Sequence, residues 1–245
     1  MKPAAAKNKY LFPLIVMASL FFLFGFITTM NNSMIDFDAI AMKYGGWSFK
    51  DSKVAEKDKK AEALYEQKQY SEAMPLFEQV CAAGKDSGNA RACTFLGYIN
   101  EKGLGVTQDY DLAAKQYVKA CNVGWPQGCF DLGILYENGN GVTKSYTKAA
   151  ALYRKACDNL DQDGCNNLGI LLFNGKGMIR DYIHAAALFS KACDAGNDQG
   201  CTNLGINYLL GLGVDKDLRK ARLLFDKACS MGDQAGCYQL NKMRE

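Results

Sequence analysis

The stretch Ser145–Arg180, SYTKAAALYRKACDNLDQDGCNNLGILLFNGKGMIR, is one copy of a unit that recurs along most of the chain. An Ala-rich segment, two cysteines, a Leu-Gly pair and a G-x-G pair follow one another in the same order before and after it. The cysteines show the period best, because Cys121, Cys157, Cys193 and Cys229 are spaced by 36 residues. A repeat of this length is typical of a solenoid, in which each unit buries its apolar side against its neighbours.

The first half of each unit has the pattern of an amphipathic helix. It reads DYDLAAKQYVKAC from Asp109, SYTKAAALYRKAC from Ser145, DYIHAAALFSKAC from Asp181 and DLRKARLLFDKAC from Asp217. Asp and Ser are good N-caps, and Ala, Leu and an aromatic residue recur at helical spacing. The sequence therefore predicts a helix, here called helix A, at the start of every unit.

The second half predicts a further helix, helix B, which ends at a glycine that can close it in the left-handed conformation. It reads GCFDLGILYENGNGV from Gly128 and GCNNLGILLFNGKGM from Gly164. Glycines also fall in the middle of helix B, where each costs about 1 kcal/mol relative to alanine. We expect the close approach of a partner helix to compensate for this cost at Gly97, Gly133, Gly169 and Gly205.

The cysteines are expected to form one disulfide at the mouth of each helical hairpin. Closing a loop of about nine residues stabilises the fold by ~2.5 kcal/mol on the chain-entropy account. A metal site is disfavoured because no C-x-x-C motif occurs and His184 is the only histidine. Disulfides persist in oxidising compartments, so they predict export. The expected pairs are Cys81–Cys93, Cys121–Cys129, Cys157–Cys165, Cys193–Cys201 and Cys229–Cys237.

The N-terminal segment is a second, independent signal for export. Lys2, Lys7 and Lys9 precede an uncharged stretch with an apolar centre, LFPLIVMASLFFLFGFI, and residues 11–30 are the only part expected to meet a membrane. Cleavage as a signal peptide and retention as an anchor both stay open. The segment YLFPLIVMASLFFLFGFITTMNN also resembles the first transmembrane helix of major facilitator sugar:proton symporters, although nothing after it would complete a transporter.

These patterns divide the chain into a signal or anchor segment, 1–35, a spacer, 36–60, and a repeat domain, 61–245. A helix is expected to begin near Val54 and to cap the solenoid. The repeats resemble the Sel1-like repeat, a relative of the tetratricopeptide repeat, and the disulfide-rich form is similar to the Helicobacter cysteine-rich proteins. The prediction is an all-α, right-handed solenoid of tetratricopeptide-like hairpins. Local departures are the insertion after Cys81, Met178 in place of valine, and Leu160 where other hairpins have glycine.

The resemblance implies penicillin binding and slow β-lactamase activity on penicillin and cephalosporin derivatives. The residues themselves add little to this hypothesis. A serine β-lactamase needs an S-x-x-K motif with companion elements. The only S-x-x-K is Ser145–Lys148, and Ser145 occupies the helix A cap position. We assign no catalytic residue, metal or cofactor.

Polar residues on helix B are the candidate ligand-binding positions. Asp131, Asn167 and Asn203 each stand two residues after the second cysteine of their unit, and Asn207 lies one turn further on. A ladder of amides at one repeat step would hydrogen-bond an extended peptide. The alternative, kept open, is that these side chains, Asn166 and His184 simply face solvent.

Two functions therefore follow as hypotheses. The first is an exported, periplasmic or secreted protein that binds a peptide, muropeptide or β-lactam and slowly hydrolyses the last. The alternative is a non-catalytic scaffold that binds a protein partner in the groove, in the periplasm or at a host interface. A formal net charge of +3, with three lysines ahead of the apolar segment, gives no support to nucleic-acid binding.

Overall fold

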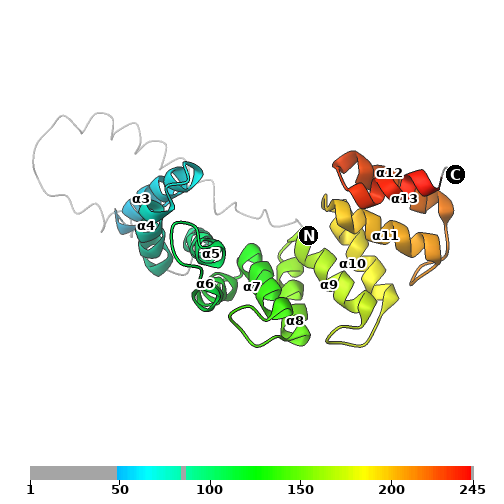
Figure 1. Cartoon of the computed structure of the whole chain (residues 1–245), viewed down its shortest axis with the longest axis horizontal. Helices are drawn as coiled ribbons and strands as arrows, with labels where there is room; N and C mark the ends of the chain where they lie inside the picture. Colours follow the sequence, from blue (N-terminus) through cyan, green and yellow to red (C-terminus); the bar gives the residue numbers. More distant parts are fainter. Residues whose placement is uncertain (1–48, 84–86, 244–245) are drawn as a thin grey trace, which may run out of the picture. The chain divides into compact units, whose positions relative to one another are not determined.

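The computed structural model describes residues 49–83 and 87–243, and every regular element in them is a helix (Figure 1). The chain divides into two units, Met1–Glu56 and Lys57–Glu245, and the second holds all the repeats. The helices are α3 Phe49–Glu66, α4 Tyr70–Ala83, α5 Ser87–Lys102, α6 Tyr110–Asn122, α7 Pro126–Asn138, α8 Tyr146–Asp158, α9 Gln162–Asn174, α10 Tyr182–Asp194, α11 Asp198–Leu210, α12 Leu218–Met231 and α13 Gln234–Lys242.

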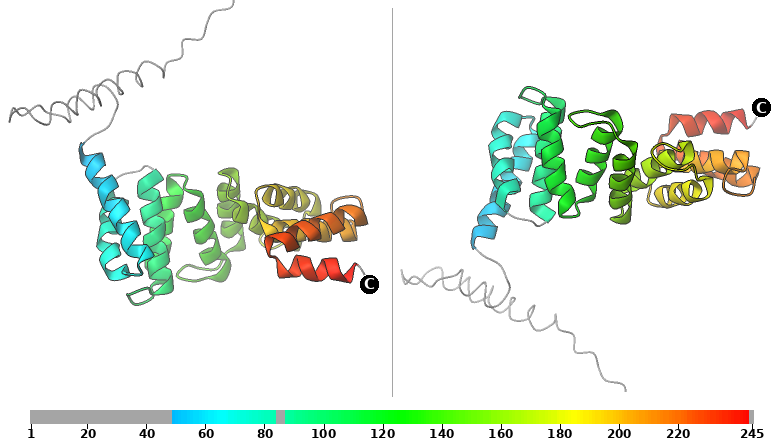
Figure 2. Two further views of the ribbon diagram at one scale, coloured as in Figure 1. Left: turned by 90° about the horizontal axis from the view of Figure 1, so that it is seen from above. Right: turned by 90° about the horizontal axis from the view of Figure 1, so that it is seen from below.

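The hairpins follow one another in chain order, as Figure 2 shows from two sides. The even-numbered helices α4 to α12 are the helices A, and the odd-numbered helices α5 to α13 are the helices B. Each helix A contacts the helix B of its own hairpin and, from α6 onward, the helix B of the hairpin before it. The expected all-α solenoid of stapled hairpins is confirmed.

The start of each helix A is set by its cap residue. The carboxylate of Asp109 accepts a hydrogen bond from the Leu112 backbone N–H at 2.9 Å, and the Ser145 hydroxyl accepts one from Lys148 at 3.3 Å. Asp181 and Asp217 cap α10 and α12 in the same way. These caps satisfy backbone donors that have no partner inside the helix, and they confirm the predicted helix starts.

The middle glycine of helix B receives an aromatic ring from the next helix A. A Cβ atom built on Gly133 would lie 2.6 Å from Cε1 of Tyr153, and one on Gly169 would lie 2.7 Å from Cε1 of Phe189. The ring therefore occupies the space that any other residue would need. The expected close approach of a partner helix is confirmed, and it explains why glycine stands in a helix interior.

All ten cysteines form the five expected disulfides, one in each hairpin. The Cα atoms are 4.5 Å apart in the pair Cys121–Cys129 and 4.9 Å apart in Cys81–Cys93, despite the inserted residues. A lysine then joins consecutive hairpins, since the Lys191 ammonium donates to the Cys157 carbonyl at 2.9 Å and Lys227 donates to Cys193 at 3.0 Å. Disulfides hold each hairpin, and packing with these lysines joins one hairpin to the next.

The capping helix α3 begins at Phe49, earlier than Val54 and inside the predicted spacer, because residues 50–66 are rich in Lys, Glu and Ala and contain no Gly or Pro. No helix in residues 49–83 and 87–243 is long and apolar enough to cross a membrane. The predicted export segment lies outside the described residues, and it stays a prediction together with the domain boundaries.

Candidate interaction surface

The helix-B face is the solvent-facing side of α7, α9 and α11, and three rows of side chains at one repeat step define it. Every member is partly or fully exposed. The rows are Asp131, Asn167 and Asn203; Ile134, Ile170 and Ile206; and Asn138, Asn174 and Leu210.

Side chains of the predicted polar ladder bond to other groups of the protein. The Asn203 amide donates to Oδ1 of Asn166 at 2.8 Å, which joins α11 to α9. The Gln127 amide donates to Oδ1 of Asp131 at 3.0 Å, within α7. Asp131 and Asn203 are therefore already oriented by neighbouring side chains, and ligand binding by this row stays a prediction.

Two asparagines have a different place from the one expected. Asn207 is fully buried, and its amide donates to the Leu212 carbonyl at 2.9 Å in the loop after α11. Asn166 is 1% exposed, so it is not a surface position. The expectation for Asn207 is wrong, and the open alternative of a solvent-facing Asn166 is excluded, because burial of helix B depends on packing against the neighbouring hairpins. The assignment of Asn207 to ligand contact is corrected to a structural role, since its side chain does not reach the surface.

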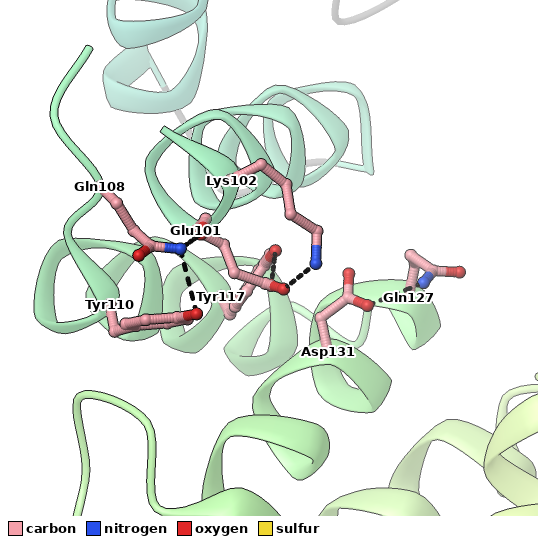
Figure 3. Close-up of polar contacts among 7 residues, drawn as sticks. All are labelled: Glu101, Lys102, Gln108, Tyr110, Tyr117, Gln127 and Asp131. Atoms are coloured by element: carbon pink, nitrogen blue, oxygen red, sulfur yellow. Dashed lines mark hydrogen bonds and ion pairs between the residues drawn. The ribbon is translucent and has the colours of Figure 1, made fainter. Parts of the chain in front are cut away.

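A cluster of polar side chains on α5 and α6 lies beside Asp131 and Gln127 of α7 (Figure 3). The Tyr117 hydroxyl donates to Oε2 of Glu101 at 2.9 Å, and the Lys102 ammonium lies 2.5 Å from Oε1 of the same carboxylate. Asp131 points toward this pair in Figure 3, with Gln127 on its other side. Burial raises the pKa of Tyr117, so its hydroxyl remains a donor.

Asp131 is the most strongly perturbed carboxyl group of the helix-B face. Burial raises its pKa to about 7, the carboxylates of Glu101 and Asp161 add to the rise, and the Gln127 hydrogen bond opposes it. The carboxyl group therefore changes between its protonated and ionised forms near neutral pH. In its protonated form it donates as well as accepts, as do the amides at the equivalent positions of α9 and α11.

We call the contact between one helix B and the following helix A a junction. The tyrosine-glutamate pair of the α5/α6 junction recurs in the α7/α8 junction and is replaced in the next one. The Tyr153 hydroxyl donates to Oε2 of Glu137 at 2.8 Å. One repeat later the pair becomes Phe173 and Phe189, whose ring centroids are 6.4 Å apart. Sequence reasoning missed these pairs. The signal was available, because the two positions change together from Glu with Tyr to Phe with Phe.

The residues weighed for catalysis have ordinary structural roles. Ser145 is the cap of α8, and the ammonium of Lys148 lies 5.0 Å from the centroid of the Tyr136 ring. His184 is exposed, and its Nδ1 is 2.6 Å from the carboxylate of the cap residue Asp181. Within residues 49–83 and 87–243, no group of three or more potential ligands would hold a metal ion.

Comparison with known proteins places these features in a family. The family model of the Sel1 repeat matches residues 90–124, 126–159, 162–197 and 198–233. The crystal structure of a Sel1 repeat protein from Oxalobacter formigenes is 30% identical, covers 74% of this chain and 73% of that chain, and has a TM-score of 0.68. A comparison with curated proteins finds no match.

Two further structures are similar. A protective antigen of uropathogenic Escherichia coli with an SLR fold is 27% identical over 71% of this chain and 36% of that chain, with a TM-score of 0.66. The cysteine-rich protein B of Helicobacter pylori is 32% identical over 54% of this chain and 98% of that chain, with a TM-score of 0.44. None of these matches is a transporter, so the resemblance of residues 10–32 to a symporter helix gains no support. With four tandem matches to one repeat model, the chain belongs to the Sel1 repeat family.

Proposed function

We propose that this protein is a non-catalytic scaffold that binds a protein partner on its helix-B face. The observation that carries the proposal is a contrast within each repeat. The ring on the helix B glycine, the disulfide and the lysine on the cysteine carbonyl recur from one hairpin to the next. The position two residues after the second cysteine varies among the repeats; it is Phe95, Asp131, Asn167, Asn203 and Gln239, so only two consecutive repeats share a residue type.

This arrangement suits recognition of a macromolecule. A rigid, repeated frame holds side chains of differing chemistry at regular intervals, so that binding would order few groups and would cost little conformational entropy. Asp131 and Asn203 are already held by Gln127 and Asn166, and isoleucines of the second row lie one turn away. Such a mixture of fixed polar groups and partly exposed aliphatic groups is typical of a protein-binding surface.

The β-lactam hypothesis has no observation in its favour. The hydroxyl of Ser145 accepts a backbone hydrogen bond as a helix cap, and the Lys148 ammonium lies over a tyrosine ring. The S-x-x-K motif is thus accounted for by helix capping and surface packing. Muropeptide binding likewise rests on resemblance alone, so the scaffold function is the better supported of the two.

The proposed compartment is an oxidising one, outside the cytoplasm. Its support is the pairing of all ten cysteines, because reducing compartments keep such thiols free. Alkylation of intact producing cells without reductant, followed by intact-mass measurement, is expected to find no modified cysteine. Labelling of most cysteines would contradict this proposal.

Site-specific photo-crosslinking in the producing cells tests the binding surface. We would place the photoreactive residue in turn at Asn138, Asn174 and Leu210, which are exposed on the helix-B face. Ala151 and Ala187, exposed on helices A, are the matched controls. The proposal predicts adducts of one defined mass from the helix-B positions and none from the controls.

The captured partner then gives a quantitative test. Its affinity for the purified, oxidised full-length protein should fall by about tenfold with Asn167→Arg, because a charge would be placed against the bound surface. The same change at Ala151 should leave affinity within about twofold. Equal crosslinking of both faces, or none from the helix-B face, would contradict the proposal.

A further inference from the structure

The loops that join one hairpin to the next form a continuous edge of the repeat unit. A Cβ atom built on Gly177 would lie 2.6 Å from the backbone nitrogen of Thr147, and the Thr147 hydroxyl donates to the Gly177 carbonyl at 3.0 Å. Gly141 approaches the backbone of Tyr110, and Gly213 approaches that of Tyr182, in the same way. Each loop therefore lies on the first turn of its own helix A before it leads into the next helix A.

Six cationic side chains follow this edge, and we call them the loop-edge strip. Tyrosine rings hold five of them close to the surface; Lys216 is the exception. Lys144 and Lys176 come from consecutive loops, yet their ammonium groups lie 5.0 and 5.4 Å from the centroid of the same ring, Tyr146. The guanidinium of Arg180 lies 5.9 Å from the Tyr182 centroid. The strip comprises Lys144, Lys148, Lys176, Arg180, Lys216 and Lys220, all exposed.

The loop-edge strip carries more positive charge than its neighbours balance. Among the described residues only one of its members has an ion pair, Lys220 with Asp217, at 3.9 Å. Asp217 and Asp181 are occupied as helix caps, and Asp215 is the remaining carboxylate on these loops. Cation-π contacts orient the cations without neutralising them, which leaves their charge available to an anionic partner.

Exposed aliphatic side chains stand among these cations. Ile179 is 90% exposed, Ile183 69% and Leu218 51%, and all three belong to the same loops and first helical turns. A partner that carries apolar groups as well as carboxylates would bury these three side chains and pair with the cations.

We propose that the loop-edge strip binds an acidic segment of a partner protein that also carries apolar side chains. The proposal rests on the scaffold function and adds a second surface with a stated partner chemistry. A nucleic acid lacks the aliphatic side chains that would cover Ile179, Ile183 and Leu218. A membrane would favour lysines that extend toward the headgroups, whereas five of these six cations lie alongside tyrosine rings.

The test uses the oxidised full-length protein and a synthetic peptide of Glu, Leu and Ser labelled with a fluorophore. Binding should be measurable by anisotropy and should weaken as NaCl rises from about 0.05 M to about 0.5 M. A peptide with Gln in place of every Glu should not bind. The double variant Lys144→Glu and Lys176→Glu should lower affinity by about tenfold or more, and Lys144→Gln with Lys176→Gln by a smaller factor.

A control variant with the same change in net charge distinguishes binding at the strip from a general effect of net charge. Lys60→Glu with Arg154→Glu makes the same change at exposed positions outside the strip and should alter affinity by less than about twofold. Circular dichroism and intact mass confirm folding and disulfides in each variant. Equal effects of the two double variants, absence of peptide binding, or tighter binding of anionic vesicles or single-stranded DNA through the strip would overturn the proposal. Crosslinks from the helix-B face that persist in such a case would leave the scaffold function standing.

Discussion

The α5/α6 and α7/α8 junctions differ from the α9/α10 and α11/α12 junctions in one buried pair. In all four, an aromatic ring of helix A fills the space over a helix B glycine. In the first two, the ring is a tyrosine whose hydroxyl donates to a glutamate, and in the last two it is a phenylalanine beside an apolar residue. The pairs are Glu101 with Tyr117, Glu137 with Tyr153, Phe173 with Phe189, and Leu209 with Phe225.

This comparison shows that one packing frame accommodates two chemistries, provided that both members change together. A buried hydroxyl or carboxylate without a partner costs free energy, while the matched polar pair and the matched apolar pair are both acceptable. Burial is the main reason that the pKa of Asp131 is raised, and the carboxylate of Glu101, a member of the first polar pair, adds to the rise. The polar or apolar character of a junction therefore affects a side chain of the proposed binding surface.

Removal of the ring should have the largest effect in both kinds of junction. Tyr153→Ala and Phe189→Ala each delete an almost completely buried ring, 0% and 2% exposed. We expect each to lower the free energy of unfolding by about 3 to 5 kcal/mol. Urea denaturation of the oxidised proteins measures this loss. A large effect at one junction and a negligible one at the other would break the idea of a shared frame.

Replacement of the tyrosine-glutamate pair by an apolar pair should have an intermediate effect on the free energy of unfolding. The effects of the two substitutions should be strongly non-additive. Tyr153→Phe leaves the Glu137 carboxylate without its donor and should cost about 1 to 2 kcal/mol in unfolding free energy. Adding Glu137→Phe recreates the apolar pair of the α9/α10 junction and should recover most of the loss. The double-mutant cycle is measured by the same denaturation. Additive costs would show that the two residues are not coupled.

The carboxyl group of Asp131 should make the free energy of unfolding depend on pH. Its pKa is about 7 in the folded protein, above the ordinary value, so the folded state holds the proton more tightly than the unfolded chain does. The free energy of unfolding should therefore fall as pH rises from about 4 to about 7 and then level off.

Asp131→Asn removes this dependence and makes the position match α9 and α11. At about pH 8 the variant should be more stable than the wild type by about 1 to 2 kcal/mol, with allowance for partial solvent contact, and this gain should vanish toward about pH 4. Thermal unfolding across the pH range checks the sign. Asn203→Asp is the control, because the residue equivalent to Glu101 in that repeat is Phe173, which has no carboxylate. If the stability of the wild type and of Asp131→Asn depended on pH in the same way, the assignment of a raised pKa to Asp131 would be contradicted.

The disulfide of the last hairpin, Cys229–Cys237, is followed by no further helix A in the described residues that would cover it. Ala156 and Leu152 cover Cys121–Cys129, whereas Cys229 and Cys237 are partly exposed. Mild reduction followed by alkylation and peptide mapping should modify Cys229 and Cys237 first, because a thiol reductant needs access to sulfur. Earlier modification of Cys157 and Cys165 would show that access is not controlled by the following hairpin.

Features that depend on neighbours along the chain were predictable. Ser145 and Asp109 cap their helices because a side-chain oxygen reaches a backbone N–H a few residues away. Cysteines placed at the end of helix A and the start of helix B meet because the hairpin turn is short. The mid-helix glycines predicted a close contact, although the partner ring was not identified.

The site was less predictable because it depends on contacts between repeats. Asn203 and Asn166 are far apart in sequence, and only stacking of α11 on α9 brings them within hydrogen-bonding distance. Burial of Asn207 and the pKa of Asp131 have the same origin, since neighbouring helices exclude water from both groups. The pattern of one repeat does not contain this information.

The sequence by itself determined the repeat, the helices, their caps and the pairing of the cysteines, because these follow from local spacing and from bonds within one hairpin. Only the tertiary structure decided which polar residues are exposed, which junctions hold a tyrosine-glutamate pair, and where cations from consecutive loops meet over one tyrosine ring. The physical reason is that burial, desolvation and charge balance depend on groups from several hairpins, which become neighbours only when the hairpins stack.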